Sequence, residues 1–193
     1  MKTKRVGLFG GLFDPLHVGH CIIAQCVLEE FDLDTILFIP AGNPPHKRKF
    51  TTFSLRYQMT EAAIKHNPHF QISDIEHRLT GKTYTIDIVR ALQKEQSGDL
   101  YLVVGSDQWK EFDTWKTPDE LLKMCRIIIV RRLGYAITGL KRRHKNIIVS
   151  SAPRIEISST MIRNKIKRQE SIQYLVPCEV LKYIQKLKLY QKT

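Results

Sequence analysis

The sequence predicts an α/β fold in which one domain is built around a doubly wound parallel sheet. Short apolar runs alternate along the chain with stretches in which apolar residues recur at helical spacing. The apolar runs are continuous rather than alternating, which is typical of strands covered by helices on both faces. With 193 residues, 42% of them hydrophobic, the chain is long enough to bury a substantial core. We therefore expect a single domain over residues 1–193.

Short apolar or β-branched runs are the expected strands. The first leads directly into a pair of glycines, and the second is stopped by Pro40, which cannot continue a sheet ladder. In chain order the expected strands are Val6–Phe9, Thr35–Ile39, Phe70–Ile75, Leu100–Val104, Ile127–Val130 and Ile147–Val149.

Stretches with apolar residues at helical spacing are the expected helices. In the first, Ile22, Ile23, Cys26 and Val27 repeat with that period. Pro177 stands near the start of the last, where its fixed φ favours helix initiation. We expect the C-terminal helical segment, about 158–190, to pack on the rest of the domain. In chain order the expected helices are Cys21–Phe31, Leu55–His66, Thr85–Glu95, Met161–Arg168 and Val180–Leu189.

The formal net charge of +12 favours polyanionic partners, without choosing among nucleotides, nucleic acid and a membrane surface. No apolar run approaches the roughly 20 residues that span a bilayer, so we expect no membrane partner. None of the four cysteines forms a CxxC pair, which argues against a zinc ribbon or a dithiol redox site. Reduced core cysteines and a cytoplasmic location are expected. The oligomeric state stays open, a homo-oligomer included.

The most informative segment is Gly10–His20, GGLFDPLHVGH, which follows the first expected strand. Small residues let backbone N–H groups approach a phosphate, and a helix start adds partial positive charge. His17 and His20 add donors that can be neutral or charged near pH 7. The segment predicts phosphate recognition at a strand-to-helix turn. Two alternatives are histidines that cap a helix, and a metal site, for which no third ligand stands at a recognisable spacing.

Two signatures far apart in the chain resemble those of the nucleotidyltransferase superfamily related to class I aminoacyl-tRNA synthetases. Residues 10–20 resemble GxFDPxHxGH, and Ile157–Arg163 resembles ISSTxIR. Three further segments narrow the resemblance to the bacterial nicotinate mononucleotide adenylyltransferases, over nearly the whole chain. They are Pro44–Lys47 (PPHK), Thr83–Thr85 (TYT, where SYT is usual) and Gly105–Asp107 followed by Trp115. The resemblance implies a Rossmann-like nucleotidyltransferase fold.

The chain departs from the family pattern at positions that leave both histidines in place. Leu12 stands where the family usually has Ser or Thr, so a phosphate contact there would have to come from a backbone N–H. Leu16 replaces a proline, and Leu133 replaces the proline of a turn. Lys82 and Thr83 stand in place of the more usual Pro-Ser.

The resemblance implies that the chain joins ATP and nicotinate mononucleotide to give nicotinate adenine dinucleotide and pyrophosphate, in NAD biosynthesis. The attacking phosphate is already an anion, which fits the lack of an obvious Ser-His-Asp or paired-carboxylate constellation. The expected catalytic residues are His17, His20 and Arg163, and the expected cofactor is Mg²⁺ bound through the substrate phosphates. The residues expected to bind ATP are Gly10, Gly11, Leu12, Phe13, Gly19, Arg132, Ile157, Ser159 and Thr160.

The motif Ile157–Arg163 also has a structural interpretation. Ser158 or Ser159 would cap a helix, and Arg163 would be solvated. In the functional interpretation, Ser159, Thr160 and the N–H groups that open their helix hold the β- and γ-phosphates, while the guanidinium neutralises them.

The resemblance also implies a set of mononucleotide-binding residues, each with a structural alternative. Trp115 would stack on the pyridine ring or belong to the core, and Asp107 would bind a ribose hydroxyl or cap a loop. Thr85 would position the pyridine carboxylate or act as an N-cap. Asp14 would orient the backbone or a histidine, or act as a cap, and Lys47 would bind phosphate or be a solvated charge. The full set is Asp14, Lys47, Thr85, Gly105, Asp107 and Trp115.

Two competing functions stay open. A sibling enzyme would keep the chemistry and use nicotinamide mononucleotide or phosphopantetheine as acceptor, although relatives of the latter kind usually carry Thr at the position of His17. A basic RNA-binding module is favoured by the net charge and by Lys141–Lys145, but aromatic residues do not interleave with the basic ones. We therefore expect ATP and nicotinate mononucleotide as partners, and no nucleic acid.

Overall fold

A computed structural model describes residues 3–42, 50–79, 81–95, 98–137 and 145–191. Its centre is a six-stranded sheet in the order β3-β2-β1-β4-β5-β6, and the strands pair in parallel throughout. This order is that of a doubly wound α/β sheet, so the predicted fold class is confirmed. The strands are β1 (Arg5–Gly11), β2 (Thr35–Pro40), β3 (Phe70–Ile72), β4 (Asp99–Gly105), β5 (Arg126–Val130) and β6 (Ile147–Val149).

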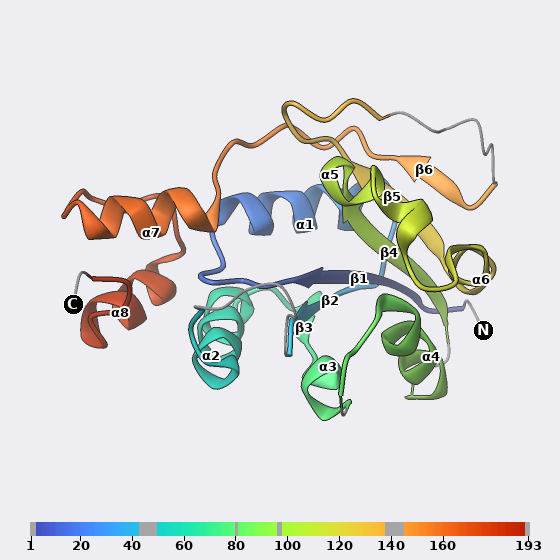
Figure 1. Cartoon of the computed structure of the whole chain (residues 1–193), viewed down its shortest axis with the longest axis horizontal. Coiled ribbons are helices and arrows are strands. Elements are labelled where there is room, and N and C mark those ends of the chain that lie inside the picture. Colours follow the sequence, from blue (N-terminus) through green and yellow to red (C-terminus); the bar gives the residue numbers. More distant parts are fainter. Residues whose placement is uncertain (1–2, 43–49, 80, 96–97, 138–144, 192–193) are drawn as a thin grey trace.

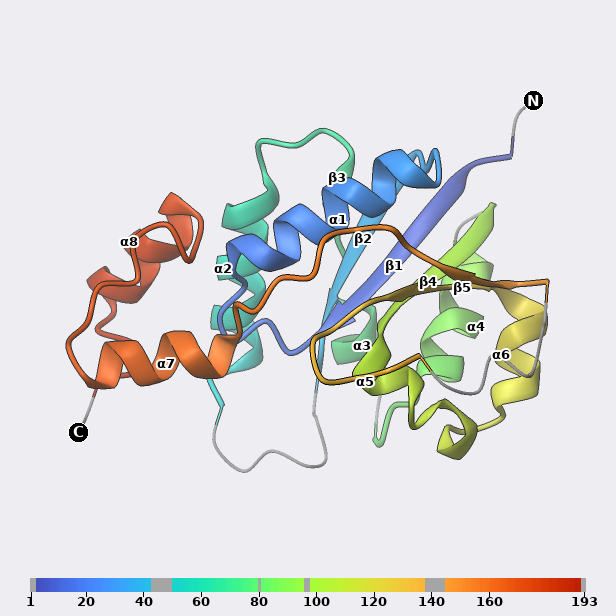
Figure 2. The same cartoon turned by 90° about the horizontal axis from the view of Figure 1, so that it is seen from above.

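Helices lie on both sides of the sheet, with α1 on one side and α3 and α4 on the other (Figure 1). Figure 2 shows α7 and α8 together at one end of the molecule, away from the chain's N-terminus. The helices are α1 (Val18–Glu30), α2 (Phe53–Ile64), α3 (Ile75–Arg78), α4 (Thr85–Glu95), α5 (Ser106–Trp109), α6 (Pro118–Met124), α7 (Ser159–Lys167) and α8 (Cys178–Lys186), with a 3₁₀ turn η1 (Phe112–Thr114).

The core is divided by the sheet, because successive residues of a strand point to opposite faces. In β2, Ile36 and Phe38 belong to a buried cluster that includes residues of α1. Leu37 and Ile39 belong to a second cluster with residues of α3, α4 and α6. A third cluster joins α2, α7 and α8, so the C-terminal helices pack on the sheet-bearing part through α2.

The predicted strands and helices are present, but some of their ends are wrong. Extended structure was expected over Phe70–Ile75, whereas β3 ends at Ile72 and Ile75 begins α3. The reason is local: the Ser73 hydroxyl accepts a hydrogen bond from the Ile75 N–H at 3.2 Å, which turns the chain into a helix. Helices α3, α5 and α6 were not predicted because four to seven residues are too few to show a period.

Helix α7 begins two residues before its predicted start. Ser158 is its N-cap, and the Ser158 hydroxyl accepts a hydrogen bond from the Met161 N–H at 3.1 Å. The capping interpretation of this serine is therefore confirmed.

All four cysteines are free, as predicted. Only Cys125 is a fully buried core residue, because Cys21 and Cys26 are half-buried and Cys178 is exposed at the start of α8. Within the described ranges, none of the helices is long and apolar enough to cross a bilayer.

Candidate active site

Residues 10–17, here called the glycine turn, and the motif Ile157–Arg163 meet at the carboxyl end of β1. The strand order reverses there, between β1 and β4. The Ser159 hydroxyl donates to the carbonyl of Pro15 at 2.9 Å. One Arg163 Nη donates to the carbonyl of Asp14 at 2.7 Å. The start of α7 therefore lies directly against the turn that carries the histidines, as the pairing of the two motifs predicts.

His17 and His20 form a stacked pair at the start of α1. The ring centroids are 3.7 Å apart and the planes differ by 23°. The backbone N–H of His17 donates to Nδ1 of His20 at 3.3 Å, so the proton of a neutral His20 ring lies on Nε2. Phe13, held at a φ of 50°, packs edge-on against His20 with centroids 5.0 Å apart. These contacts fix the direction in which the His20 N–H donates.

Both imidazoles are neutral at pH 7. Burial, followed by the charge of Arg132, lowers the pKa of His17 to about 4. Burial lowers the pKa of His20 well below its ordinary value, and His17 and Arg132 lower it further. The sequence left the charge of these residues open, and the structure places them as neutral donors.

Among the described residues, two buried side-chain atoms have no hydrogen-bond partner. They are Nδ1 of His17, and Oδ1 of Asp107, which is held only by an ion pair with Arg132. Leaving a buried polar atom unpaired costs about 1–3 kcal/mol, so such atoms are expected to find a partner when a ligand binds.

A small hollow of about 50 Å³, here called the histidine hollow, separates the histidines from β4 and β5. Arg132 lies at its edge, with Nε 3.4 Å from Oδ1 of Asp107. Two glycines keep the hollow open: a Cβ at Gly19 would stand 3.0 Å from Nδ1 of His17, and one at Gly105 would collide with the Asp107 carboxylate. The lining residues are Phe9, His17, Gly19, His20, Ile23, Val103, Val104, Gly105, Val130, Arg131, Arg132, Ile155 and Ile157.

A second hollow of about 250 Å³, here called the tryptophan hollow, lies on the other side of the β1 end. Trp115 is half-buried in its wall and contacts Phe112, with ring centroids 5.3 Å apart. Thr85 also lines it and is the first residue of α4, not its cap, because Tyr84 supplies the carbonyl that accepts the first helical N–H groups. The lining residues are Leu8, Gly10, Gly11, Leu12, Ile39, Ala41, Glu76, Thr85, Ile88, Val89, Leu102, Val103, Val104, Gln108 and Trp115.

The comparisons with known proteins agree on one family. The profile described as cytidylyltransferase-like matches residues 8–165. A Thermoanaerobacter protein named "Probable nicotinate-nucleotide adenylyltransferase" is 42% identical, over 99% of this chain and 96% of the relative. A Clostridium novyi protein with the same name is 38% identical, over 97% of this chain and 100% of the relative. The chain belongs to the nicotinate-nucleotide adenylyltransferase family.

A solved structure confirms the fold of this family member. The Plasmodium falciparum nicotinic acid mononucleotide adenylyltransferase in complex with NaAD matches with a TM-score of 0.83. The match covers 97% of each chain at 20% sequence identity.

Several site residues lie differently from what the sequence predicts. Gly10, Gly11 and Leu12, which are expected to contact ATP, line the tryptophan hollow. The Phe13 side chain is buried in the core cluster beside α1, which leaves only its backbone for a ligand. Lys47 lies outside the described residues.

The Asp14 carboxylate is directed away from the histidines. Its oxygens accept hydrogen bonds from the Thr51 N–H at 3.3 Å and from the Tyr190 hydroxyl at 2.7 Å. The carboxylate therefore orients backbone, one of the roles that the sequence predicts, and joins three distant parts of the chain; neither of these hydrogen bonds goes to a histidine ring. Arg163 is likewise not solvated: besides the Asp14 carbonyl, it donates to the Thr160 hydroxyl at 3.1 Å.

Sequence reasoning missed Arg56, which is fully buried below the glycine turn. Its guanidinium donates to the carbonyls of Leu12 at 2.8 Å, Ala41 at 2.6 Å and Thr51 at 2.9 Å. It thereby joins the glycine turn to the chain on either side of residues 43–49. A signal was present, because an arginine shares the buried face of α2 with Met59.

No group of three His, Cys, Asp or Glu side chains in the described parts of the chain is arranged to hold a metal ion. The donors around the histidine hollow are neutral rings, backbone N–H groups and guanidinium groups, which suit phosphate oxygens and not a cation.

Proposed function

We propose that this chain transfers the adenylyl group of ATP to the phosphate of nicotinate mononucleotide, releasing pyrophosphate. One observation carries the assignment to this site: the start of α7 lies against the turn that leads into the buried, stacked rings of His17 and His20, so the two motifs of the family meet there. The relatives named for this activity match over nearly the full chain and support it.

The chemistry requires positioning and charge stabilisation more than proton transfer. A phosphate oxygen of the mononucleotide forms a bond to the α-phosphorus of ATP as the bond from that phosphorus to the pyrophosphate oxygen breaks. A general base is unnecessary because the nucleophile is already an anion. Neutral His17 and His20 suit this reaction, since they donate hydrogen bonds to phosphate oxygens in a site where burial keeps them uncharged.

We assign the ATP phosphates to the space between α1 and α7. The starts of both helices provide backbone N–H groups and partial positive charge. Arg163, Ser159 and Thr160 adjoin this space, and Arg163 supplies a full charge. Arg132, Gly19 and Ile157 line the adjoining histidine hollow, and we place the adenosine side of ATP over its mouth, since about 50 Å³ is too small to enclose it. Mg²⁺ carried by the phosphates would neutralise part of their charge.

We assign the mononucleotide to the tryptophan hollow. Trp115 offers its ring for stacking on the pyridine, and Thr85 stands at the start of α4 in the same wall. We also assign Asp107 and Gly105 to the mononucleotide, at the boundary between the two hollows, which share Val103 and Val104. The Asp107 carboxylate, whose Oδ1 lies 3.4 Å from Nε of Arg132, would accept from a ribose hydroxyl there.

The test is a direct assay for pyrophosphate with ATP, Mg²⁺ and three acceptors: nicotinate mononucleotide, nicotinamide mononucleotide and phosphopantetheine. We expect the highest kcat/KM with nicotinate mononucleotide. Preference for phosphopantetheine would reassign the acceptor. No turnover with any acceptor, together with tight and salt-dependent RNA binding, would replace the enzyme by an RNA-binding module.

A further inference from the structure

We propose that Lys116, held by Asp87, is a positioning residue that sets the place of Trp115 in the tryptophan hollow and thereby the affinity for the mononucleotide. The inference rests on the proposed function and adds a residue pair to which that function assigns no role. It starts from an ion-pair network that lies beside the hollow and joins three segments of the chain.

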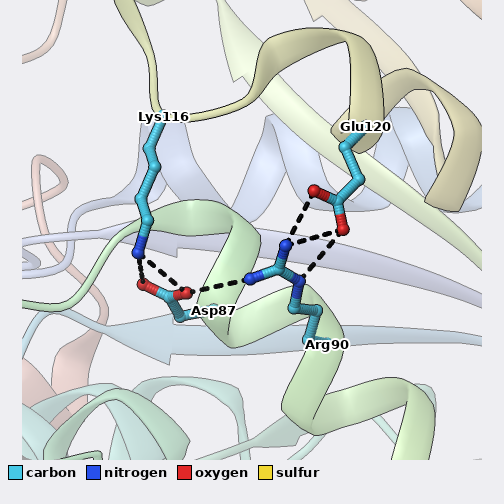
Figure 3. Close-up of polar contacts among 4 residues, drawn as sticks. All are labelled: Asp87, Arg90, Lys116 and Glu120. Carbon is cyan, nitrogen blue, oxygen red and sulfur yellow. Dashed lines mark hydrogen bonds and ion pairs between the residues drawn. The ribbon is translucent and has the colours of Figure 1, made fainter.

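The network begins at the residue next to the tryptophan (Figure 3). The Lys116 ammonium lies 3.3 and 3.2 Å from the two carboxylate oxygens of Asp87, in the first turn of α4. The same ammonium lies 4.7 Å from the centre of the Tyr84 ring, within cation–π range. Lys116 therefore connects the chain directly after Trp115 to the helix that begins at Thr85.

The second half of the network fixes the other side of this segment. Arg90 lies one turn further along α4, and its Nη1 is 3.6 Å from the Asp87 carboxylate. Its Nη2 donates to both carboxylate oxygens of Glu120 at 2.7 Å, and its Nε donates to one of them at 3.1 Å. Glu120 belongs to α6, which starts just after Lys116. Residues 115–117 are thus held between two contacts to α4.

The backbone between these contacts makes a sharp turn. Thr117 has a φ of 48° and a ψ of 58°, the left-handed conformation that side chains other than glycine seldom adopt. A turn of this kind persists only where its surroundings hold it. Phe112 and Leu121 anchor the chain on either side of this turn in the core, and the contacts at Lys116 and Glu120 flank it. Trp115 stands two residues before Thr117, at the edge of the turn.

The network is too exposed to be needed for folding. The side chains of Lys116 and Asp87 are 44% and 27% exposed, and those of Arg90 and Glu120 are 42% and 40% exposed. Exposed ion pairs contribute little to stability. The elements that they connect are already anchored in the core by other residues, among them Val89, Phe112 and Leu121. What the network can change is the placement of the half-buried Trp115, which lines both the tryptophan hollow and the adjoining hollow that contains Lys116.

The experiment compares Lys116→Met and Asp87→Asn with the wild type in steady-state assays. We expect each variant to raise the KM for nicotinate mononucleotide about two- to fivefold, the range set by an exposed ion pair, with kcat and the KM for ATP unchanged. Lys116→Arg, which keeps the ion pair, should restore the wild-type KM. Glu95→Gln is the matched control, because it breaks an exposed pair with Arg78 at the far end of the same helix.

Asp87→Asn separates positioning from simple attraction. If Lys116 acted by drawing in the anionic substrate, removal of the neighbouring carboxylate would lower the KM, and that result would overturn the inference. An unchanged KM in both variants would overturn it as well. Turnover by the wild type tests the proposed function separately. If the wild type makes no pyrophosphate, the proposed function and the role of Lys116 both fail. If the wild type turns over and the variants keep its KM, only the role of Lys116 fails.

Discussion

Around the histidines the contacts are buried and made largely to backbone atoms, whereas beside Trp115 they are exposed and ionic. Arg56 and Arg163 reach carbonyl groups of the glycine turn, and burial keeps His17 and His20 neutral. The network of Figure 3 joins side chains that remain partly in water. Buried polar contacts are costly to break, and exposed ion pairs are cheap. In the proposed function, the end of the site that holds the ATP phosphates is thus built from buried contacts, and the end that would bind the acceptor from weak ones.

The largest effect is expected at the histidine end. His20→Ala removes a donor whose direction is fixed by His17 and Phe13, and by comparison with loss of one oxyanion-hole donor it should lower kcat about 10²–10³-fold. Steady-state kinetics with both substrates measures it, after circular dichroism has shown that the variant folds. A kcat equal to that of the wild type would remove His20 from the reaction.

The two arginines Arg56 and Arg90 allow a matched test of burial. Arg56→Met would leave carbonyls of the glycine turn and its neighbours without a donor, at a cost of about 3 kcal/mol or more in the free energy of unfolding. Arg90→Met breaks only exposed contacts and should lower the free energy of unfolding far less than Arg56→Met does. Urea denaturation measures both. Equal costs would contradict the contrast between the two ends.

Part of this contrast could be predicted from the sequence, and part could not. The resemblance predicts that the two motifs meet, because both would hold one triphosphate. Strand order alone does not predict it, since β6, the strand before α7, lies at the far edge of the sheet from β1. The partners of Arg163 and Ser159 are carbonyl groups of the glycine turn, and their place depends on turn geometry that residue types do not encode. The bond from Tyr190 to Asp14 spans 176 residues and leaves no local pattern.

Two other features that the sequence analysis did not predict, Arg56 and helix α6, have a local cause. Arg56 stands on the buried face of α2, where a charge is rarely found without partners, yet its partners are again backbone carbonyls. The helix that carries Glu120 is too short to show a period, although Pro118 at its first turn is a start signal. The network at Lys116 therefore became visible only when α4 and α6 were placed side by side.

Acid should lower the free energy of unfolding because His17 is buried in its neutral form. Burial lowers the pKa of His17 from 6.5 in the unfolded chain to about 4 in the folded state, so between these values the unfolded chain binds more protons. The free energy of unfolding is therefore highest above pH 6.5 and falls as the pH drops toward 4. Protonation of His17 accounts for about 3 kcal/mol of this fall. Denaturation at a series of pH values measures the slope. His17→Gln should flatten it, and an unchanged slope in that variant would place the acid sensitivity elsewhere.

The smallest effect is expected at the tryptophan end. Trp115→Ala removes the stacking surface and should raise the KM for nicotinate mononucleotide about tenfold, within the range that base–aromatic stacking supplies. The KM for ATP should stay constant, because Trp115 lines the tryptophan hollow and not the histidine hollow. Trp115→Phe retains an aromatic face and should recover most of the affinity. An effect confined to ATP would exchange the substrates assigned to the two hollows, and would make the ion pair at Lys116 a support for the nucleotide that donates the adenylyl group.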